Sequence, residues 1–120
     1  MPQSDVYLGN PNLKKANTEI QFTEENVKEF LKCKDDPVYF ARQYIKIVNV
    51  DEGLVPFNMW PFQEKLIKNF HKNRFNICMM PRQTGKSTTS VSYLLHYAIF
   101  NDNINIGILA NKAATARDLL

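Results

Sequence analysis

The chain has 120 residues, carries a formal net charge of +3 and is 44% apolar. This composition fits one small globular domain and excludes a wholly disordered chain. No apolar run reaches the roughly 18 residues of a membrane span, and the polar N-terminus has no apolar signal segment, so we expect a cytoplasmic protein without a membrane partner. The isolated Cys33 and Cys78 fit neither a disulfide framework nor a zinc site, and we expect Cys78 to pack in the core.

The first part of the chain is predicted to contain an arm and two helices. Residues 1–22 contain glycine, prolines and asparagines without periodicity, which indicates an extended arm. Thr23, followed by two glutamates, is a typical N-cap for a helix that ends near Lys34. Asp36 followed by Pro37 indicates the start of a second helix. Three aromatic side chains of this second helix are expected to be mainly core residues: Tyr39, Phe40 and Tyr44.

A β-hairpin is predicted after these helices. The apolar runs 45–50 and 54–57 flank Asp51-Glu52-Gly53, which is a typical turn sequence. A strand ending in Asp-Glu also resembles the acidic motif that holds Mg²⁺ in nucleotide hydrolases, but an asparagine interrupts the run and we favour the turn. We therefore divide the chain into the arm, a helical and hairpin subdomain over 23–57, and an incomplete core over 58–120.

The last part of the chain is predicted to be a parallel βαβ unit preceded by a helix that begins at Pro61. Its strands are expected at 75–80 and 104–110, with a helix between them over 87–100 and another from 112 to 120. The central helix has one apolar stripe, which should be buried: Val91, Leu94, Leu95, Ala98 and Ile99. Two parallel strands are normally part of a larger covered sheet, so we expect the chain to be the front portion of a longer protein.

The segment Pro81–Ser87, Pro-Arg-Gln-Thr-Gly-Lys-Ser, joins the first of these strands to the helix. Gly-Lys-Ser in this position is the second half of a phosphate-binding loop, G-x-x-x-x-G-K-[ST], although Met80 replaces its first glycine. Gly85 would let the backbone approach the phosphates, Lys86 would supply positive charge, and Ser87 would ligate Mg²⁺.

The other residues of the loop extend this binding site. Thr88 begins the helix whose N–H groups would face the anion. Arg82 lies close enough in sequence to stabilise the γ-phosphate as an arginine finger acting within the same chain, or it forms a simple hydrogen bond to a phosphate or a neighbouring carboxylate. The residues of the loop and helix start expected to contact the nucleotide are Arg82, Gln83, Thr84, Gly85, Lys86, Ser87 and Thr88.

Gln63 lies between aromatic residues upstream of the loop. A glutamine amide can pair with both N6 and N7 of adenine, and an aromatic neighbour could stack on the base. From spacing alone we favour an ordinary solvent-facing glutamine. The isolated His71 and His96 are more typical of a helix surface or a satisfied core than of a metal site. Several basic residues could contact nucleic acid but are more typical of a solvated face: Lys14, Lys15, Lys65, Lys68, Lys72 and Arg74.

Five segments in this order resemble the large terminase subunits of tailed, myovirus-like bacteriophages, a family of P-loop NTPases of α/β fold. They are Gly9–Asn17, Asp36–Phe40, Phe62-Gln63, Pro81–Ser87 and Ile108–Lys112. The loop, with Arg-Gln inside it and no leading glycine, resembles the deviant Walker A motif of these ATPases. The resemblance covers nearly the whole chain.

The resemblance implies an ATPase that packages double-stranded DNA into a procapsid in the host cytoplasm. It implies that Lys86 and Ser87 bind the phosphates and Mg²⁺ of ATP, that Arg82 stabilises the γ-phosphate, and that Gln63 binds adenine. It further implies a portal protein, a small terminase subunit and a homo-oligomeric ring as partners. The family's catalytic glutamate, coupling motif and nuclease domain have no counterpart here. A helicase-type translocase and a nucleotide-binding module without turnover therefore stay as alternatives.

Overall fold

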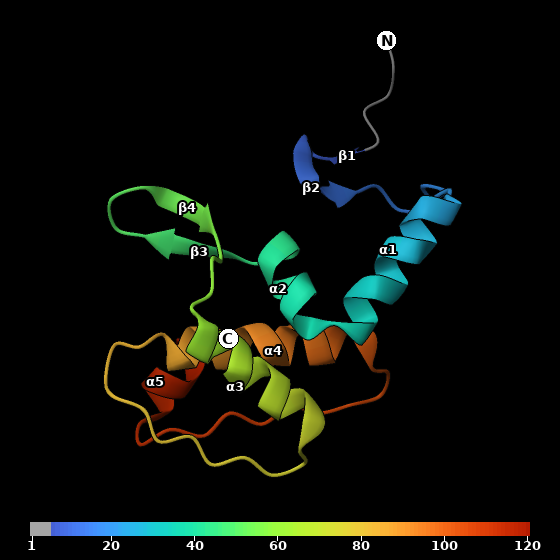
Figure 1. Cartoon of the computed structure of the whole chain (residues 1–120). Coiled ribbons are helices and arrows are strands. Elements are labelled where there is room, and N and C mark those ends of the chain that lie inside the picture. Colours follow the sequence, from blue (N-terminus) through green and yellow to red (C-terminus); the bar gives the residue numbers. More distant parts are fainter. Residues whose placement is uncertain (1–5) are drawn as a thin grey trace.

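The computed structural model describes residues 6–120 and has a mixed α/β architecture with five helices (Figure 1). Residues 1–5 of the expected arm lie outside the described residues. The elements in chain order are β1 (Val6–Tyr7), β2 (Asn10–Lys14), α1 (Glu24–Asp35), α2 (Pro37–Tyr44), β3 (Lys46–Asn49), β4 (Gly53–Pro56), α3 (Pro61–Lys72), α4 (Lys86–Phe100) and α5 (Ala113–Arg117). The strands form two separate antiparallel pairs, β1 with β2 and β3 with β4.

The expected starts of α1 and α2 are confirmed, and a side-chain cap fixes each of them. The Thr23 hydroxyl accepts a hydrogen bond from the Asn26 N–H at the start of α1. The Asp36 carboxylate accepts bonds from the N–H groups of Val38 and Tyr39, at 2.9 and 3.1 Å, at the start of α2. These bonds satisfy donors that have no partner within the helix, so Thr23 defines where α1 begins and Asp36 defines where α2 begins.

The predicted hairpin is confirmed as β3 and β4, with Lys46 opposite Pro56 and Asn49 opposite Gly53. Asp51 and Glu52 lie in its turn, as the preferred interpretation of the Asp-Glu pair requires. The Asn49 side chain accepts a bond from the Asp51 N–H at 2.9 Å, and Gly53 adopts the left-handed conformation with φ +75°. The turn chemistry therefore explains this acidic pair without a metal.

The core lies where α2, the end of the hairpin and α3 meet, and α4 packs against α2 and α3 (Figure 1). Its buried residues are Val38, Ala41, Phe57, Met59 and Ile67. An ion pair between Arg42 of α2 and Glu64 of α3 lies beside this core. The core thus takes side chains from both sides of the expected subdomain boundary at residue 57.

The two strands expected at 75–80 and 104–110 are not formed, and the described residues contain no parallel βαβ pairing. Both segments are irregular and unpaired, and several of their apolar side chains face solvent: Ile77 is 95%, Met79 94% and Leu109 97% exposed. Cys78 is also exposed rather than packed in a core. Parallel strands are stable when both faces of the sheet are covered, and no described element covers these segments.

Helix α4 begins one residue before the expected start and ends where predicted, but the expected burial of its apolar stripe is wrong. Its buried positions are the polar residues Thr89, Ser92 and His96, whereas Leu95 and Ile99 are about half exposed. The two strands that would accompany this helix in a βαβ unit are not formed, so the stripe has no sheet to pack on. The buried side of α4 instead packs against α2 and α3, and Cys33 of α1 bonds to His96.

His96 should make the folded state sensitive to mild acid. It is 3% exposed, and its Nε2 lies 2.8 Å from the Cys33 carbonyl oxygen. Burial lowers the pKa of His96 below its ordinary value, outweighing the opposite effect of the Cys33 carbonyl. Below about pH 6.5 the unfolded chain therefore binds the proton more strongly than the folded chain. We therefore expect the free energy of unfolding to decrease as the pH is lowered below this value. His96 should contribute at most ~1.4 kcal/mol per pH unit to the decrease.

Urea denaturation between pH 5 and pH 8 measures this dependence. His96→Gln should flatten the curve below pH 6.5, whereas His71→Gln, which alters an exposed neighbouring histidine, should leave most of it in place. An unchanged slope in His96→Gln would show that another group is responsible.

Candidate nucleotide-binding site

The loop before α4 turns sharply because two of its residues adopt left-handed backbone conformations. Gln83 has φ +59° and Gly85 has φ +71°. Gly85 is the N-cap of α4, and its carbonyl accepts bonds from the Thr89 N–H at 2.9 Å and the Thr89 hydroxyl at 2.8 Å. Glycine is needed here because left-handed φ is costly for residues with a Cβ. The turn directs the loop backbone toward the start of α4.

The N-terminus of α4 has no side-chain cap and no acidic residue in its first turn. This differs from α1, where Thr23 caps the helix and Glu24 and Glu25 follow. The first N–H groups of a helix lack intrahelical partners and carry a partial positive charge. The start of α4 is therefore suited to bind an anion through backbone N–H groups.

Two side-chain bonds hold the loop in a compact form. The Thr84 hydroxyl donates to the Pro81 carbonyl oxygen at 3.0 Å, and the Lys86 ammonium donates to the Met80 carbonyl oxygen at 3.2 Å. The second bond directs the Lys86 side chain back across the loop. Lys86 thus places its charge at the loop rather than out in solvent, and its phosphate-binding role stays a prediction.

Gln63 is buried and bonded to the loop, so the interpretation of it as solvent-facing is wrong. The side chain is 5% exposed. Its Oε1 accepts a bond from the Trp60 N–H at 2.9 Å, and its Nε2 donates to the Thr84 carbonyl oxygen at 3.1 Å. Glutamine at the third position of a helix, with Pro61 at the first, is a recognisable sequence signal for the bond to Trp60. The bond to Thr84 joins segments distant in sequence and has no such signal.

The adenine role of Gln63 stays a prediction. The amide retains one N–H and one lone pair beyond the two bonds that it makes. Adenine recognition would need both of these groups to become accessible. Gln63 also approaches Gly85 closely, because a Cβ at that glycine would lie 2.6 Å from the Gln63 Nε2. The geometry therefore gives Gln63 a direct part in positioning the loop.

The remaining expected site residues lie together because they belong to one loop and one helix turn. Arg82, Gln83, Ser87 and Thr88 are exposed. Within residues 6–120 the one ion pair joins Arg42 and Glu64, so Arg82 has no carboxylate partner among these residues. In the same part of the chain no three His, Cys, Asp or Glu side chains are grouped as metal ligands. A Mg²⁺ ion at the loop would therefore depend on Ser87 and on phosphate oxygens.

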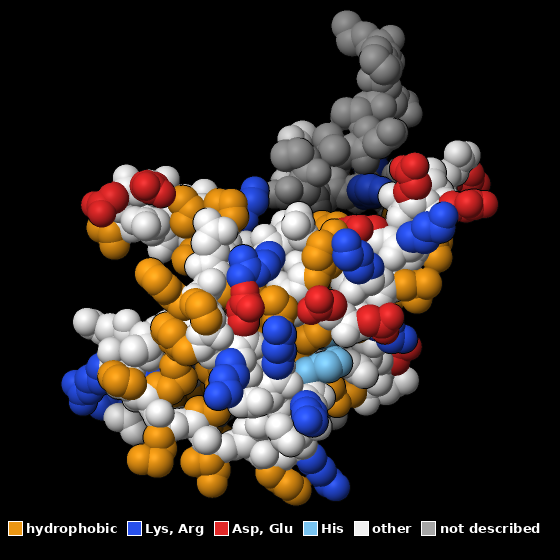
Figure 2. Space-filling model, in the orientation of Figure 1, with side chains coloured by type: hydrophobic (Ala, Val, Ile, Leu, Met, Phe, Trp, Pro, Cys, Tyr) orange, Lys and Arg blue, Asp and Glu red, His pale blue; other side chains and the backbone are white. Residues whose placement is uncertain are grey.

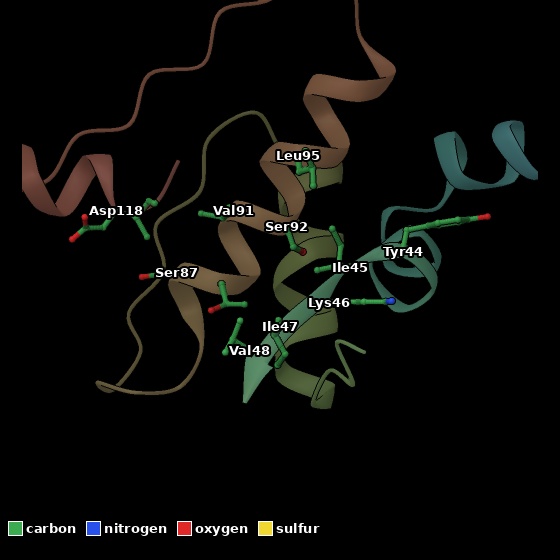
Figure 3. Close-up of a pocket in the computed structure, with 12 residues that line it drawn as sticks. Tyr44, Ile45, Lys46, Ile47, Val48, Ser87, Val91, Ser92, Leu95 and Asp118 are labelled. Carbon is green, nitrogen blue, oxygen red and sulfur yellow. The ribbon is translucent and has the colours of Figure 1, made fainter. Parts of the chain in front are cut away.

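A hollow of about 550 Å³ opens beside Ser87 and Thr88, between α4, β3 and the end of α5 (Figure 3). Apolar side chains from β3 and α4 form much of its wall, and Asp118 also lines it. The hydroxyl oxygen of Ser92, another wall residue, is buried and has no hydrogen-bond partner. Sequence reasoning missed Ser92, because a serine within a helix carries no positional signal of this kind.

A comparison of the chain with models of known protein families found no match. In the part of the chain that the structure describes, no helix combines the length and apolar character that crossing a bilayer requires.

Replacement of Gly85 by alanine should destabilise the fold. The left-handed φ alone costs a residue with a Cβ about 1–2 kcal/mol, and the new methyl group would displace the Gln63 amide from its bond to Thr84. Urea denaturation should show a loss in unfolding free energy of at least that size. Gly107→Ala is the matched control, because nothing lies within 4 Å of its added Cβ and its φ is not positive. Equal effects of the two variants would contradict the strained loop.

Proposed function

We propose that this chain is the ATP-binding part of a viral DNA-packaging motor of the large-terminase type. The observation that carries the proposal is the uncapped N-terminus of α4, with Gly85 in a left-handed conformation and Lys86 directed across the loop. The loop sequence and its resemblance to the deviant Walker A motif support the same assignment. The P-loop NTPase core of this proposal includes a parallel sheet, which the described residues do not form.

An anionic ligand fits the residues that are present. The backbone N–H groups at the start of α4 and the Lys86 ammonium would hold the phosphates, and Ser87 would contribute a hydroxyl to Mg²⁺. Bound Mg-ATP would supply the phosphoanhydride bond that water cleaves. Lys86 and the exposed Arg82 would then neutralise charge at the γ-phosphate. Gln63 would hold the loop in register with α3 and, in the terminase assignment, contact adenine.

The proposed location and partners rest on the resemblance to large terminase subunits. This assignment places the protein in the host cytoplasm at the procapsid, with double-stranded DNA, a portal protein and a small terminase subunit as partners in a homo-oligomeric assembly. A helicase-type translocase is the enzyme alternative, because it shares an upstream glutamine and a phosphate loop. The location of Asp51 and Glu52 in a hairpin turn favours a third candidate, a nucleotide-binding module without turnover. ATP affinity and phosphate release measured on one sample separate that module from both ATPases.

Lys86→Ala should reduce ATP affinity below the range of isothermal titration calorimetry, because it removes the one side-chain charge held across the loop. Lys112→Ala is the matched control, since it removes an exposed lysine elsewhere and should bind ATP like the parent chain. Unchanged ATP affinity in Lys86→Ala, in a sample with native circular dichroism, would contradict the phosphate site.

Gln63→Ala tests the adenine role separately from the loop-positioning role. Loss of the bond to the Thr84 carbonyl should weaken the binding of ATP and of inorganic triphosphate to the same extent. Loss of a contact to the adenine base should weaken the binding of ATP alone, so we expect the larger loss of affinity for ATP. Competition titrations with both ligands measure the difference, and equal losses would restrict Gln63 to positioning the loop.

A further inference from the structure

Helix α3 has a basic stripe on its exposed side. Lys65, Lys68 and Lys72 are exposed and spaced at i, i+3 and i+7, so they share one face of the helix. The opposite face contains the buried Leu66 and Ile67. With a rise of 1.5 Å per residue, the stripe extends over about 10 Å. A row of this length is longer than one phosphate group, so it can contact several phosphates of one chain.

The charges of this stripe have no acidic partner on their own helix. Glu64, the one acidic residue of α3, is paired with Arg42 of α2. Figure 2 shows Lys and Arg side chains gathered over the place that α3 occupies in Figure 1. An uncompensated row of cations attracts a polyanion and is the electrostatic footprint of nucleic-acid binding.

The stripe leads to an aromatic hollow at the C-terminal end of α3. This hollow has a volume of about 470 Å³ and includes Lys72 itself. Its aromatic wall residues are Phe70, His71, Tyr93 and Tyr97, and its polar ones include Asn73, Arg74 and Asn76. Tyr97 is 41% exposed, so the hollow offers an accessible ring.

A second accessible ring lies next to this hollow in the sequence. Phe75 is 83% exposed, and the Arg74 guanidinium lies 5.2 Å from the centre of its ring. Aromatic rings beside a cationic track are the two components of surfaces that bind single strands, where bases stack on rings and phosphates follow the cations.

We propose that the basic stripe of α3 and its aromatic hollow form a binding surface for single-stranded nucleic acid. The phosphates lie along Lys65, Lys68 and Lys72, and an unstacked base enters the hollow against Tyr97. A duplex keeps its bases stacked in pairs and cannot present one to the hollow. The surface is separate in sequence from the phosphate loop and does not depend on the proposed ATP site.

Fluorescence anisotropy with a labelled oligothymidylate tests the phosphate contacts through their salt dependence. The triple variant Lys65→Ala, Lys68→Ala, Lys72→Ala should reduce the slope of log affinity against log salt by about 2, at roughly 0.7 for each phosphate contact. The triple variant Lys14→Ala, Lys28→Ala, Lys112→Ala removes the same charge from exposed positions elsewhere and should keep the slope. Equal slopes in the two triple variants would overturn the assignment of the stripe.

The aromatic contact is tested by Tyr97→Ala, which should weaken single-strand binding by about 5- to 150-fold, the range measured for one stacked base. Tyr97→Phe keeps the ring and should keep the affinity. Phe75→Ala provides a second variant at a position with little burial. A duplex of the same length should bind without any effect of Tyr97→Ala. An equal loss for duplex and single strand, or no loss in either aromatic variant, would overturn the proposal.

Lys86→Ala separates this surface from the ATP site. It should abolish nucleotide binding and leave oligothymidylate binding unchanged. Loss of both activities in a folded sample would place the nucleic acid at the loop and contradict a separate surface on α3.

Discussion

The amide of Gln63 connects the two elements on which the candidate site depends. One end of this amide holds the N-terminus of α3 through the Trp60 N–H, and the other holds the loop through the Thr84 carbonyl oxygen. Both bonds are made by a side chain that is 5% exposed. An unmade buried bond of this kind is costly, so the loop and α3 should move together. Gly85 is part of the same arrangement, because the space that its Cβ would need is taken by Gln63.

The two hydrogen bonds of the Gln63 amide hold the loop in place without using the backbone N–H groups at the start of α4. The Lys86 ammonium bonds to a carbonyl at the start of the loop, and Gly85 offers no side-chain cap. Backbone N–H groups and one lysine charge are therefore directed to one small region. Such a preorganised arrangement binds an anion without first reordering the chain. The hollow beside Ser87 adds a partly apolar space next to this region.

Local features of the fold could be predicted from sequence, because capping and turn residues act over three or four positions. Thr23 and Asp36 located two helix starts, and Gly53 located the turn of the β3–β4 hairpin. The strand expected at 75–80 is not formed, because a strand also depends on partners elsewhere in the chain, and Ile77 and Met79 have none among the described residues. The buried side of α4 was also misassigned, since packing against α2 and α3 selected Thr89 and His96 over the apolar stripe.

In the candidate site, the loop could be predicted from Gly-Lys-Ser and its position before an amphipathic helix, whereas the bond from Gln63 to Thr84 joins residues 21 positions apart and required the structure. The central claim is that the start of α4 binds the phosphates of ATP. The most direct measurement is a titration of the ¹⁵N-labelled chain with Mg-ATP, followed by amide chemical shifts. We expect the largest changes at the N–H groups of residues 85–88, with smaller changes at the Gln63 side-chain amide. Saturable shifts elsewhere, with these amides unmoved, would contradict it.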